Sequence, residues 1–315
     1  MKYIYLLILN ILVFQNLLLA NDNIELLCKE FLVSSKNTES NSKHNKDILF
    51  KTGVLWKIIS PEKNTNYLYG TIHSQDYSVS KIPYEVRLAL VKSKKLILEI
   101  IPDNKANMVY ENMIYYKNGK QLDELLEKAF FKKLEKQMKH YDLDDIELNN
   151  LKYMKPWAAF NLIGRPKAVR APSLERNLLK FAQKRMMKIE SLETMNEIVS
   201  SLDKLSINDQ LYILKDTICN RKRVIKEIKT LVDLYVKRDA IGIIELSTSK
   251  NFKDETYSRY MQKMLHDRNK KMLKKITKEF NNGNAFVAVG ILHLIAKDGL
   301  LESLKNLDYT IEVIY

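Results

Sequence analysis

The chain has 315 residues, of which 46% are hydrophobic, so it can bury a full core. Its formal net charge of +14 raises nucleic acid or an anionic membrane as partners. However, lysines lie beside Asp and Glu along the chain, as in residues 120–139, and a solvated helix face explains short basic groups such as residues 221–223. We therefore expect no nucleic-acid partner.

The first twenty residues have the layout of a secretory signal peptide. Residues 1–2 form a short positive start, residues 3–20 are almost wholly apolar, and the small Ala20 stands at the expected cleavage point. An uncleaved membrane anchor is the alternative, because an apolar run of about 18 residues can just cross a bilayer. Polar side chains interrupt the run and favour cleavage. We predict a periplasmic or secreted chain with no membrane span after cleavage.

Two cysteines, Cys28 and Cys219, follow the predicted signal peptide. In an oxidising compartment they could form one disulfide. Two unpaired thiols are the alternative, because the sequence does not give the distance between them. Residues 21–50 are polar and predict a flexible leader, so we expect one folded domain over residues 51–315.

The folded domain is predicted to begin with strands around one helix. Two β-rich runs, at residues 54–59 and 67–71, flank a polar turn and predict a hairpin. A helix is expected over residues 83–94, because Pro83 suits a first helical position. The apolar, β-branched residues 95–101 then predict a buried strand.

The middle of the chain is mostly helical in its pattern. Apolar residues recur at helical spacing in residues 122–134 and again in residues 174–182. Residues 187–192 predict a further strand. Thr194 and Glu197 then form a capping box that opens the next helix of a long helix-rich stretch.

The end of the chain repeats the pattern of its beginning. Residues 67–73 and residues 285–293 both run as a strand followed by Gly-x-x-His, and each leads through a helix into another strand. Such βαβ crossovers make the two strands of each unit parallel. The predicted fold class is therefore α/β (α+β), with two pseudo-repeated βαβ units in a mixed, largely parallel sheet and a large helical insertion in the middle.

The two motif histidines, His73 and His293, should emerge where their strands end, at the sheet edge that binds ligands in open α/β folds. The glycine of each motif allows close approach of the backbone or a strained turn. Neutral imidazole is a common metal ligand. A single buried histidine is more often a hydrogen-bonded core residue, but the duplicated context favours a shared metal site.

Two glutamates could complete that site. Glu99 interrupts a predicted buried strand, where an unpaired charge is costly. Glu193 directly follows the strand at residues 187–192. Either carboxylate could bind the metal that activates water, or serve as the general base. The structural alternatives are an ion pair for Glu99 and a second helix cap at Glu193.

Arg268 and Asn269 stand at a predicted helix start, after His266. They are candidates for binding a substrate carbonyl or carboxylate. The alternative is that Asn269 caps the helix and Arg268 lies at the surface. His44, His140 and His266 lack a comparable context and are expected at the surface.

These motifs together resemble the TraB/GumN (TraB/PrgY/GumN, TIKI-like) family over residues 53–315. The resemblance is carried by residues 53–58 (Gly-Val-Leu-Trp-Lys-Ile), 67–73 (Tyr-Leu-Tyr-Gly-Thr-Ile-His), 98–99 (Leu-Glu), 155–157 (Lys-Pro-Trp), 192–194 (Leu-Glu-Thr), 268–269 (Arg-Asn) and 286–293 (Phe-Val-Ala-Val-Gly-Ile-Leu-His). Ser191, Ile198 and residues 294–296 depart from the residues that are usual in the family.

The resemblance implies a metal-dependent hydrolase, because the family includes animal TIKI proteins, metalloproteases that trim a secreted signalling protein with manganese or cobalt. It implies a peptide or protein substrate and a divalent metal (Mn, Co or Zn). It gives the metal-site role to His73, Glu99 and His293, with Glu193, Arg268 and Asn269 as further catalytic candidates. A non-catalytic periplasmic binding or regulatory protein is the alternative. Two histidines and a carboxylate also suit a non-haem iron oxygenase, but nothing else in the sequence suggests redox chemistry.

Overall fold

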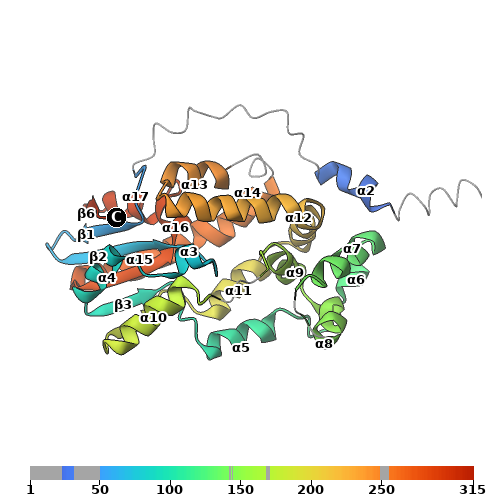
Figure 1. Cartoon of the computed structure of the whole chain (residues 1–315), viewed down its shortest axis with the longest axis horizontal. Helices are drawn as coiled ribbons and strands as arrows, with labels where there is room; N and C mark the ends of the chain where they lie inside the picture. The colour runs from blue at the N-terminus through green and yellow to red at the C-terminus, as the bar shows by residue number, and fades with distance from the viewer. Residues whose placement is uncertain (1–22, 32–49, 142, 144, 168–170, 249–254) are drawn as a thin grey trace, which may run out of the picture. The chain divides into compact units, whose positions relative to one another are not determined.

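The structure is a computed structural model that describes residues 23–31, 50–141, 143, 145–167, 171–248 and 255–315 (Figure 1). The predicted signal peptide and His44 lie outside the described residues. The chain divides into two compact units. Of the described residues, unit 1 contains those within 23–31, 114–167 and 206–225, and unit 2 contains those within 50–113, 171–205 and 226–315.

The described elements of unit 1 are helical, as expected for the insertion. They are α2 (Ile24–Leu27), η1 (Cys28–Phe31), α6 (Leu122–Leu125), α7 (Lys128–Met138), α8 (Asp145–Asn149), η3 (Asn150–Tyr153), α9 (Pro156–Ile163) and the first part of α12 (Ile207–Val236). Cys28 and Cys219 form a disulfide, which settles the alternative that the sequence left open. Next to it, Asn220 departs from helical geometry and donates a hydrogen bond to the Phe31 carbonyl at 2.7 Å. These contacts tie η1 to the middle of α12.

Unit 2 contains a six-stranded sheet in the order β4-β3-β5-β2-β1-β6. Its strands are β1 (Leu55–Ile59), β2 (Thr65–Thr71), β3 (Lys95–Leu98), β4 (Lys188–Ser191), β5 (Ala285–Gly290) and β6 (Thr310–Val313). β1 pairs antiparallel with both of its neighbours, and the other pairs are parallel. The predicted α/β fold class with a largely parallel sheet is confirmed.

The helices of unit 2 supply the rest of its core. They are α3 (Tyr77–Ser80), α4 (Tyr84–Val91), α5 (Asn104–Met113), α10 (Leu174–Lys184), α11 (Met195–Asp203), the end of α12, α13 (Ala240–Ser247), α14 (Glu255–Met261), η5 (Gln262–His266), α15 (Asp267–Asn282), α16 (Ile291–Ile295) and α17 (Leu300–Lys305). The central strands β3 and β5 are buried on both sides, which is why they read as continuous apolar runs. No helix among the described residues is long and apolar enough to cross a membrane.

Most predicted elements of unit 2 are present. The hairpin pairs Ile59 with Thr65 across its turn. The capping box is formed, since Thr194 Oγ1 accepts from the Glu197 backbone N–H at 3.2 Å and the Glu197 carboxylate accepts from the Thr194 N–H at 2.8 Å. The strand predicted over residues 95–101 ends at Leu98, so Glu99 leaves the sheet instead of interrupting it.

The helix start predicted at Arg268 and Asn269 is wrong. Helical structure is continuous from Glu255 to Asn282, with a π-helical turn at Gln262–His266. Arg268 and Asn269 are therefore interior residues of a helix, and both are buried. Such π-helical turns are frequent at functional sites, because the inserted residue redirects the side chains that follow.

Candidate functional site

Four neighbouring parallel strands of unit 2 end at the same edge of the sheet. Thr71 of β2 pairs with Gly290 of β5, and Leu98 of β3 pairs with Ala288 of β5. Beyond β3, the Glu193 N–H donates to the Glu99 carbonyl at 3.0 Å. This register brings the residues that follow β2, β3, β4 and β5 into one cluster.

Glu99 lies at the centre of the cluster. Its Oε2 accepts a hydrogen bond from the Gly290 N–H at 3.0 Å and lies 3.7 Å from His73 Nε2. Its Oε1 contacts the Arg268 guanidinium and lies 3.9 Å from His293 Nε2. The sequence-predicted trio of His73, Glu99 and His293 is thus brought together.

The other ring nitrogen of each histidine has its own partner. His73 Nδ1 lies 2.8 Å from Oε1 of Glu175, in an ion pair. His293 Nδ1 lies 2.6 Å from Oδ1 of Asn269, whose Nδ2 donates to the His293 carbonyl at 3.3 Å. Both rings therefore direct Nε2 towards Glu99. This is the arrangement of metal-binding histidines, whose second nitrogen is usually fixed by a carboxylate or an amide or carbonyl oxygen.

Glu193 is bound by Arg268. Arg268 Nε donates to both Glu193 oxygens, at 2.9 and 3.1 Å, and Nη2 donates to Oε2 at 2.7 Å. Nη1 of Arg268 donates to the Met264 carbonyl at 3.1 Å, in the π-helical turn. The guanidinium thus links Glu193 to Glu99 from within the protein, and the surface position considered for Arg268 is wrong.

The cluster shifts the pKa values of its members in opposite directions. Burial lowers the pKa of His293 to about 4, although the Glu99 carboxylate acts against this. At His73, partial desolvation is outweighed by the Glu175 and Glu99 carboxylates, which raise the pKa of the ring well above its usual value. Burial also opposes ionisation of Glu99, but His73, His293 and Arg268 hold its pKa well below the usual value.

The cluster carries more negative than positive charge. Glu99, Glu175 and Glu193 are all buried; the Arg268 guanidinium contacts Glu99 and Glu193, and Glu175 pairs with His73. Arg268 and the protonated His73 ring compensate two of the three carboxylates, so one negative charge is left without compensation, and a second one when His73 loses its proton to bind a metal. Burying uncompensated charge costs several kcal/mol in general, so this arrangement favours an added cation.

A small glycine keeps the middle of the cluster open. A Cβ atom placed on Gly290 would lie 3.5 Å from Glu99 Oε2, 3.5 Å from His293 Cδ2 and 3.6 Å from His73 Nε2. The nitrogen and oxygen donors around this space fit Mn, Co or Zn. As arranged here, however, no three His, Cys, Asp or Glu side chains of the described residues already form a metal-binding group.

Comparison with known proteins assigns the chain to a family. The profile of the TraB/PrgY/gumN family matches residues 54–313, which include every member of the cluster. The chain belongs to the TraB/PrgY/gumN family. No curated protein and no solved structure matches it.

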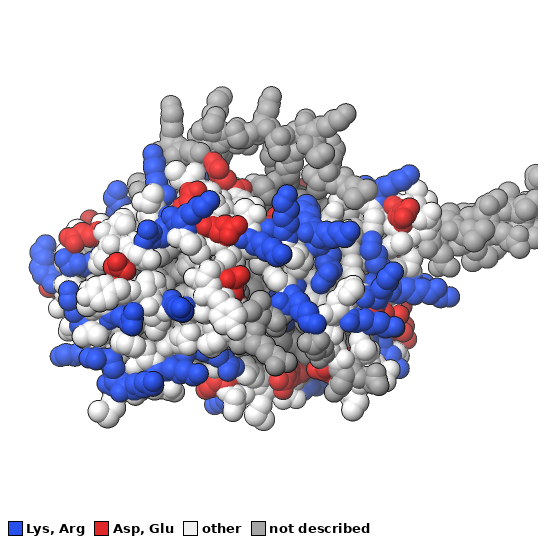
Figure 2. Space-filling model, in the orientation of Figure 1, with Lys and Arg blue, Asp and Glu red and all other residues white. Residues whose placement is uncertain are grey.

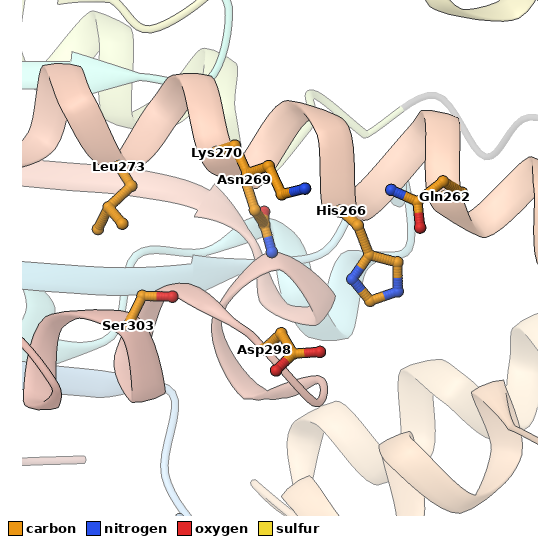
Figure 3. A pocket seen from close by; sticks show the side chains of 7 residues that line it. All are labelled: Gln262, His266, Asn269, Lys270, Leu273, Asp298 and Ser303. Atoms are coloured by element: carbon orange, nitrogen blue, oxygen red, sulfur yellow. The ribbon is translucent and has the colours of Figure 1, made fainter.

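Beside the cluster of this TraB/PrgY/gumN protein lies a polar pocket of about 390 Å³ (Figure 3). It is lined by Gln262, His266, Asn269, Lys270, Leu273, Asp298 and Ser303. In Figure 3, the first five residues belong to the helix of η5 and α15, and His266, Asn269 and Leu273 extend from it towards the side on which Asp298 and Ser303 lie. Asn269 thus contributes to the pocket and also contacts the His293 ring. His266 is partly buried here, whereas His140 is exposed as expected.

Sequence reasoning missed two residues of this TraB/PrgY/gumN site. Glu175 lies in the first turn of α10, after the N-cap Ser173, where an acidic residue is common for helix stability alone, so its position carries no functional signal. Tyr235 of α12 is buried, and its hydroxyl donates to the Gly70 carbonyl at 2.7 Å. It also lies 3.1 Å from the Tyr69 hydroxyl, and it fixes the backbone of β2 shortly before His73.

Basic side chains of the protein are widely spread. Figure 2 shows Lys and Arg at many separate places on the visible face, with Asp and Glu between them. On this face the basic side chains are therefore mixed with acidic ones.

Proposed function

We propose that this TraB/PrgY/gumN protein is an exported, metal-dependent hydrolase that cleaves peptide bonds. One observation supports this most: Nε2 of His73 and Nε2 of His293 both face the buried carboxylate of Glu99, across the space left by Gly290. Two nitrogens and one oxygen form a typical donor set of an open catalytic metal site.

The protonation of His293 gives a physical reason for a cation. Its Nδ1 must carry the ring proton, because it lies 2.6 Å from the Asn269 oxygen and the Asn269 amide nitrogen is used as a donor. With a pKa of about 4, the ring is neutral near pH 7, so Nε2 presents a lone pair towards Glu99. Two electron-rich atoms that face one another favour a metal ion between them.

A metal held by His73, Glu99 and His293 would polarise a substrate carbonyl and lower the pKa of a bound water. Side chains of the protein orient the proposed metal ligands. Asn269 holds the His293 ring, and Arg268 holds Glu99. Because Arg268 engages both oxygens of Glu193, we assign Glu193 to holding the guanidinium and not to proton transfer.

The burial of the cluster indicates the side from which a substrate would enter. The side chain of His73 is 61% exposed, whereas those of Glu99 and His293 are 8% and 7% exposed. Substrate would therefore approach past His73, with Glu99 and His293 forming the floor. An extended peptide could reach such an open edge of the sheet.

Two features support export. Residues 1–20 have the composition of a signal peptide, and the Cys28–Cys219 disulfide suits an oxidising compartment. Detection of a mature N-terminus after residue 20 in the secreted or periplasmic fraction would test this part.

A non-catalytic binding or regulatory protein is the second candidate. The observation that favours it is Arg268, an internal cation that already contacts Glu99. In that case, the cluster would be a stable ion network that needs no metal. The two candidates differ in their expected metal content.

Metal titration by calorimetry after chelation tests the proposal. We expect about one Mn, Co or Zn ion per chain, with affinity strongly reduced in His73→Ala and in His293→Ala. His140→Ala, an exposed histidine of unit 1, is the matched control and should bind as the wild type does. A peptide library should be cleaved in a chelator-sensitive manner by the wild type and the control. Metal binding that is equal in all four proteins would refute the site, and metal binding without any cleavage would favour the non-catalytic candidate.

A further inference from the structure

The two histidines of the cluster are held in different ways. His293 is buried within α16, so packing and the Asn269 amide together fix its ring. His73 follows β2 in a segment without regular structure, and most of its side-chain surface is exposed. Packing alone cannot hold the His73 ring, so an additional interaction is needed there.

Glu175 provides that interaction. It belongs to the first turn of α10, and its side chain is only 11% exposed. Its Oε1 lies 2.8 Å from His73 Nδ1, on the side of the ring opposite the nitrogen that faces Glu99. A buried carboxylate needs a counter-charge, and the His73 ring supplies it as an ion pair, since Oε1 accepts no aligned hydrogen bond from the described residues.

We propose that Glu175 is a positioning residue that keeps the proton of His73 on Nδ1 and thereby presents Nε2 to the space beside Gly290. A carboxylate oxygen at 2.8 Å repels a lone pair on Nδ1 and attracts a proton there. The ring orientation and the tautomer are then both set by one contact. This inference deepens the proposed function. It rests on that function in one respect, because the metal ion that Nε2 would bind is part of the proposal.

The first test does not involve metal. ¹⁵N NMR of the His73 ring in chelated protein, at a pH where the ring is neutral, reports which nitrogen carries the proton. We expect the Nδ1–H form in the wild type and in the conservative variant Glu175→Asp, and a shift towards the Nε2–H form in Glu175→Leu. Glu175→Gln keeps the shape of the side chain and removes its charge, so it gives a partial shift even if the leucine variant does not fold. Glu312→Gln, at an exposed ion pair with Lys57, is the control.

The second test measures Zn²⁺ or Mn²⁺ affinity by calorimetry. Loss of a group that fixes a metal-binding histidine typically weakens metal affinity by roughly 10- to 100-fold. We expect a loss of this size in Glu175→Leu, a smaller one in Glu175→Gln, and near wild-type affinity in Glu175→Asp and Glu312→Gln.

The two tests separate this inference from the proposed function. If His73 keeps the same tautomer in every folded Glu175 variant, the inference is wrong, whatever the metal results are. If the tautomer shifts but the wild type binds no metal, Glu175 positions His73 as proposed, and it is the metal-dependent function that fails. If the tautomer shifts and metal affinity stays unchanged, the ring does not depend on Glu175 for binding, and the positioning role is refuted.

Discussion

The ends of β2 and β5 carry the same Gly-x-x-His motif in two different environments. At the end of β2, His73 is exposed and paired with the Glu175 carboxylate. At the end of β5, His293 is buried in α16 and paired with the Asn269 amide. Equal spacing thus places two rings at one sheet edge, while their surroundings give one ring an ionic partner and the other a neutral one.

The glycines of the two motifs, Gly70 and Gly290, also have different surroundings. A Cβ atom on Gly70 would come within 2.3 Å of Ile291 Cδ1 and 3.2 Å of the Ile291 Cα, so Gly70 allows β2 to pack closely against α16. A Cβ atom on Gly290 would meet cluster atoms only at ordinary contact distances of 3.5 Å or more. Gly70 therefore serves packing, whereas Gly290 keeps space between the candidate ligands.

The largest expected effect is on stability, at the buried end. His293→Ala should lower the free energy of unfolding by about 2–4 kcal/mol, because it leaves a cavity and an unpaired Asn269 amide oxygen. His73→Ala should cost about 1 kcal/mol or less, since the ring is mainly exposed. Urea unfolding of the chelated proteins measures both. Equal losses would show that burial does not distinguish the two ends.

The glycines allow a second test with opposite outcomes. Gly70→Ala should destabilise the protein by about 1–3 kcal/mol through crowding against Ile291, and should leave metal affinity nearly unchanged. Gly290→Ala should change the unfolding free energy by less than about 1 kcal/mol, because its new methyl group meets no close contact. It should nevertheless weaken metal binding, since the methyl group occupies the space between the ligands. Thermal unfolding and calorimetry on both variants provide the measurements.

The histidines should also give opposite pH dependences in the chelated protein. The folded-state pKa of His293 is lowered to about 4, so between about pH 6.5 and pH 4 the unfolded chain binds a proton that the folded chain does not. Its contribution to stability therefore falls as the pH is lowered, by about 2 kcal/mol from pH 7 to pH 5. His73 has a raised pKa, so the stability it contributes is complete below the unfolded-state value and is lost as the pH rises through the folded-state value.

Neutral replacements separate these two contributions. His293→Gln should flatten the stability profile on the acidic side, and His73→Gln should flatten it on the alkaline side, in urea titrations at a series of pH values. If both variants keep the wild-type dependence of stability on pH, the assignment of the two pKa shifts to His293 and His73 is wrong.

The sequence predicted the sheet edge well because that part depends on local pattern. The apolar strands, the motif histidines and the capping box at Thr194 are all written in short segments, and the strand register then brings their ends together. The continuous helix at Arg268 was predicted wrongly. The segment before Arg268 has no Gly or Pro, and a π-helical turn at Gln262–His266 continues the helix into α15, where Asn269 is an interior residue and not a cap.

The residues that contact the two histidines could not be predicted from the sequence. They lie on elements distant along the chain, and each fits its own helix for structural reasons alone. Glu175 looks like an ordinary acidic residue at a helix start. Tyr235 lies in the amphipathic helix α12, far along the chain from β2. In such cases only the tertiary packing determines which polar atom meets which.

Tyr235 provides the smallest and most local test of the comparison. Tyr235→Phe removes the hydroxyl that donates to the Gly70 carbonyl, a contact that belongs to the β2 end alone. We expect a loss of about 1 kcal/mol in unfolding free energy, the usual net value of one buried hydrogen bond. Tyr84→Phe, whose side chain is exposed, should leave stability unchanged. In NMR spectra of the Tyr235→Phe variant, the His73 ring signals should shift while those of His293 stay in place, because the Gly70 carbonyl belongs to β2, which leads directly into the His73 segment.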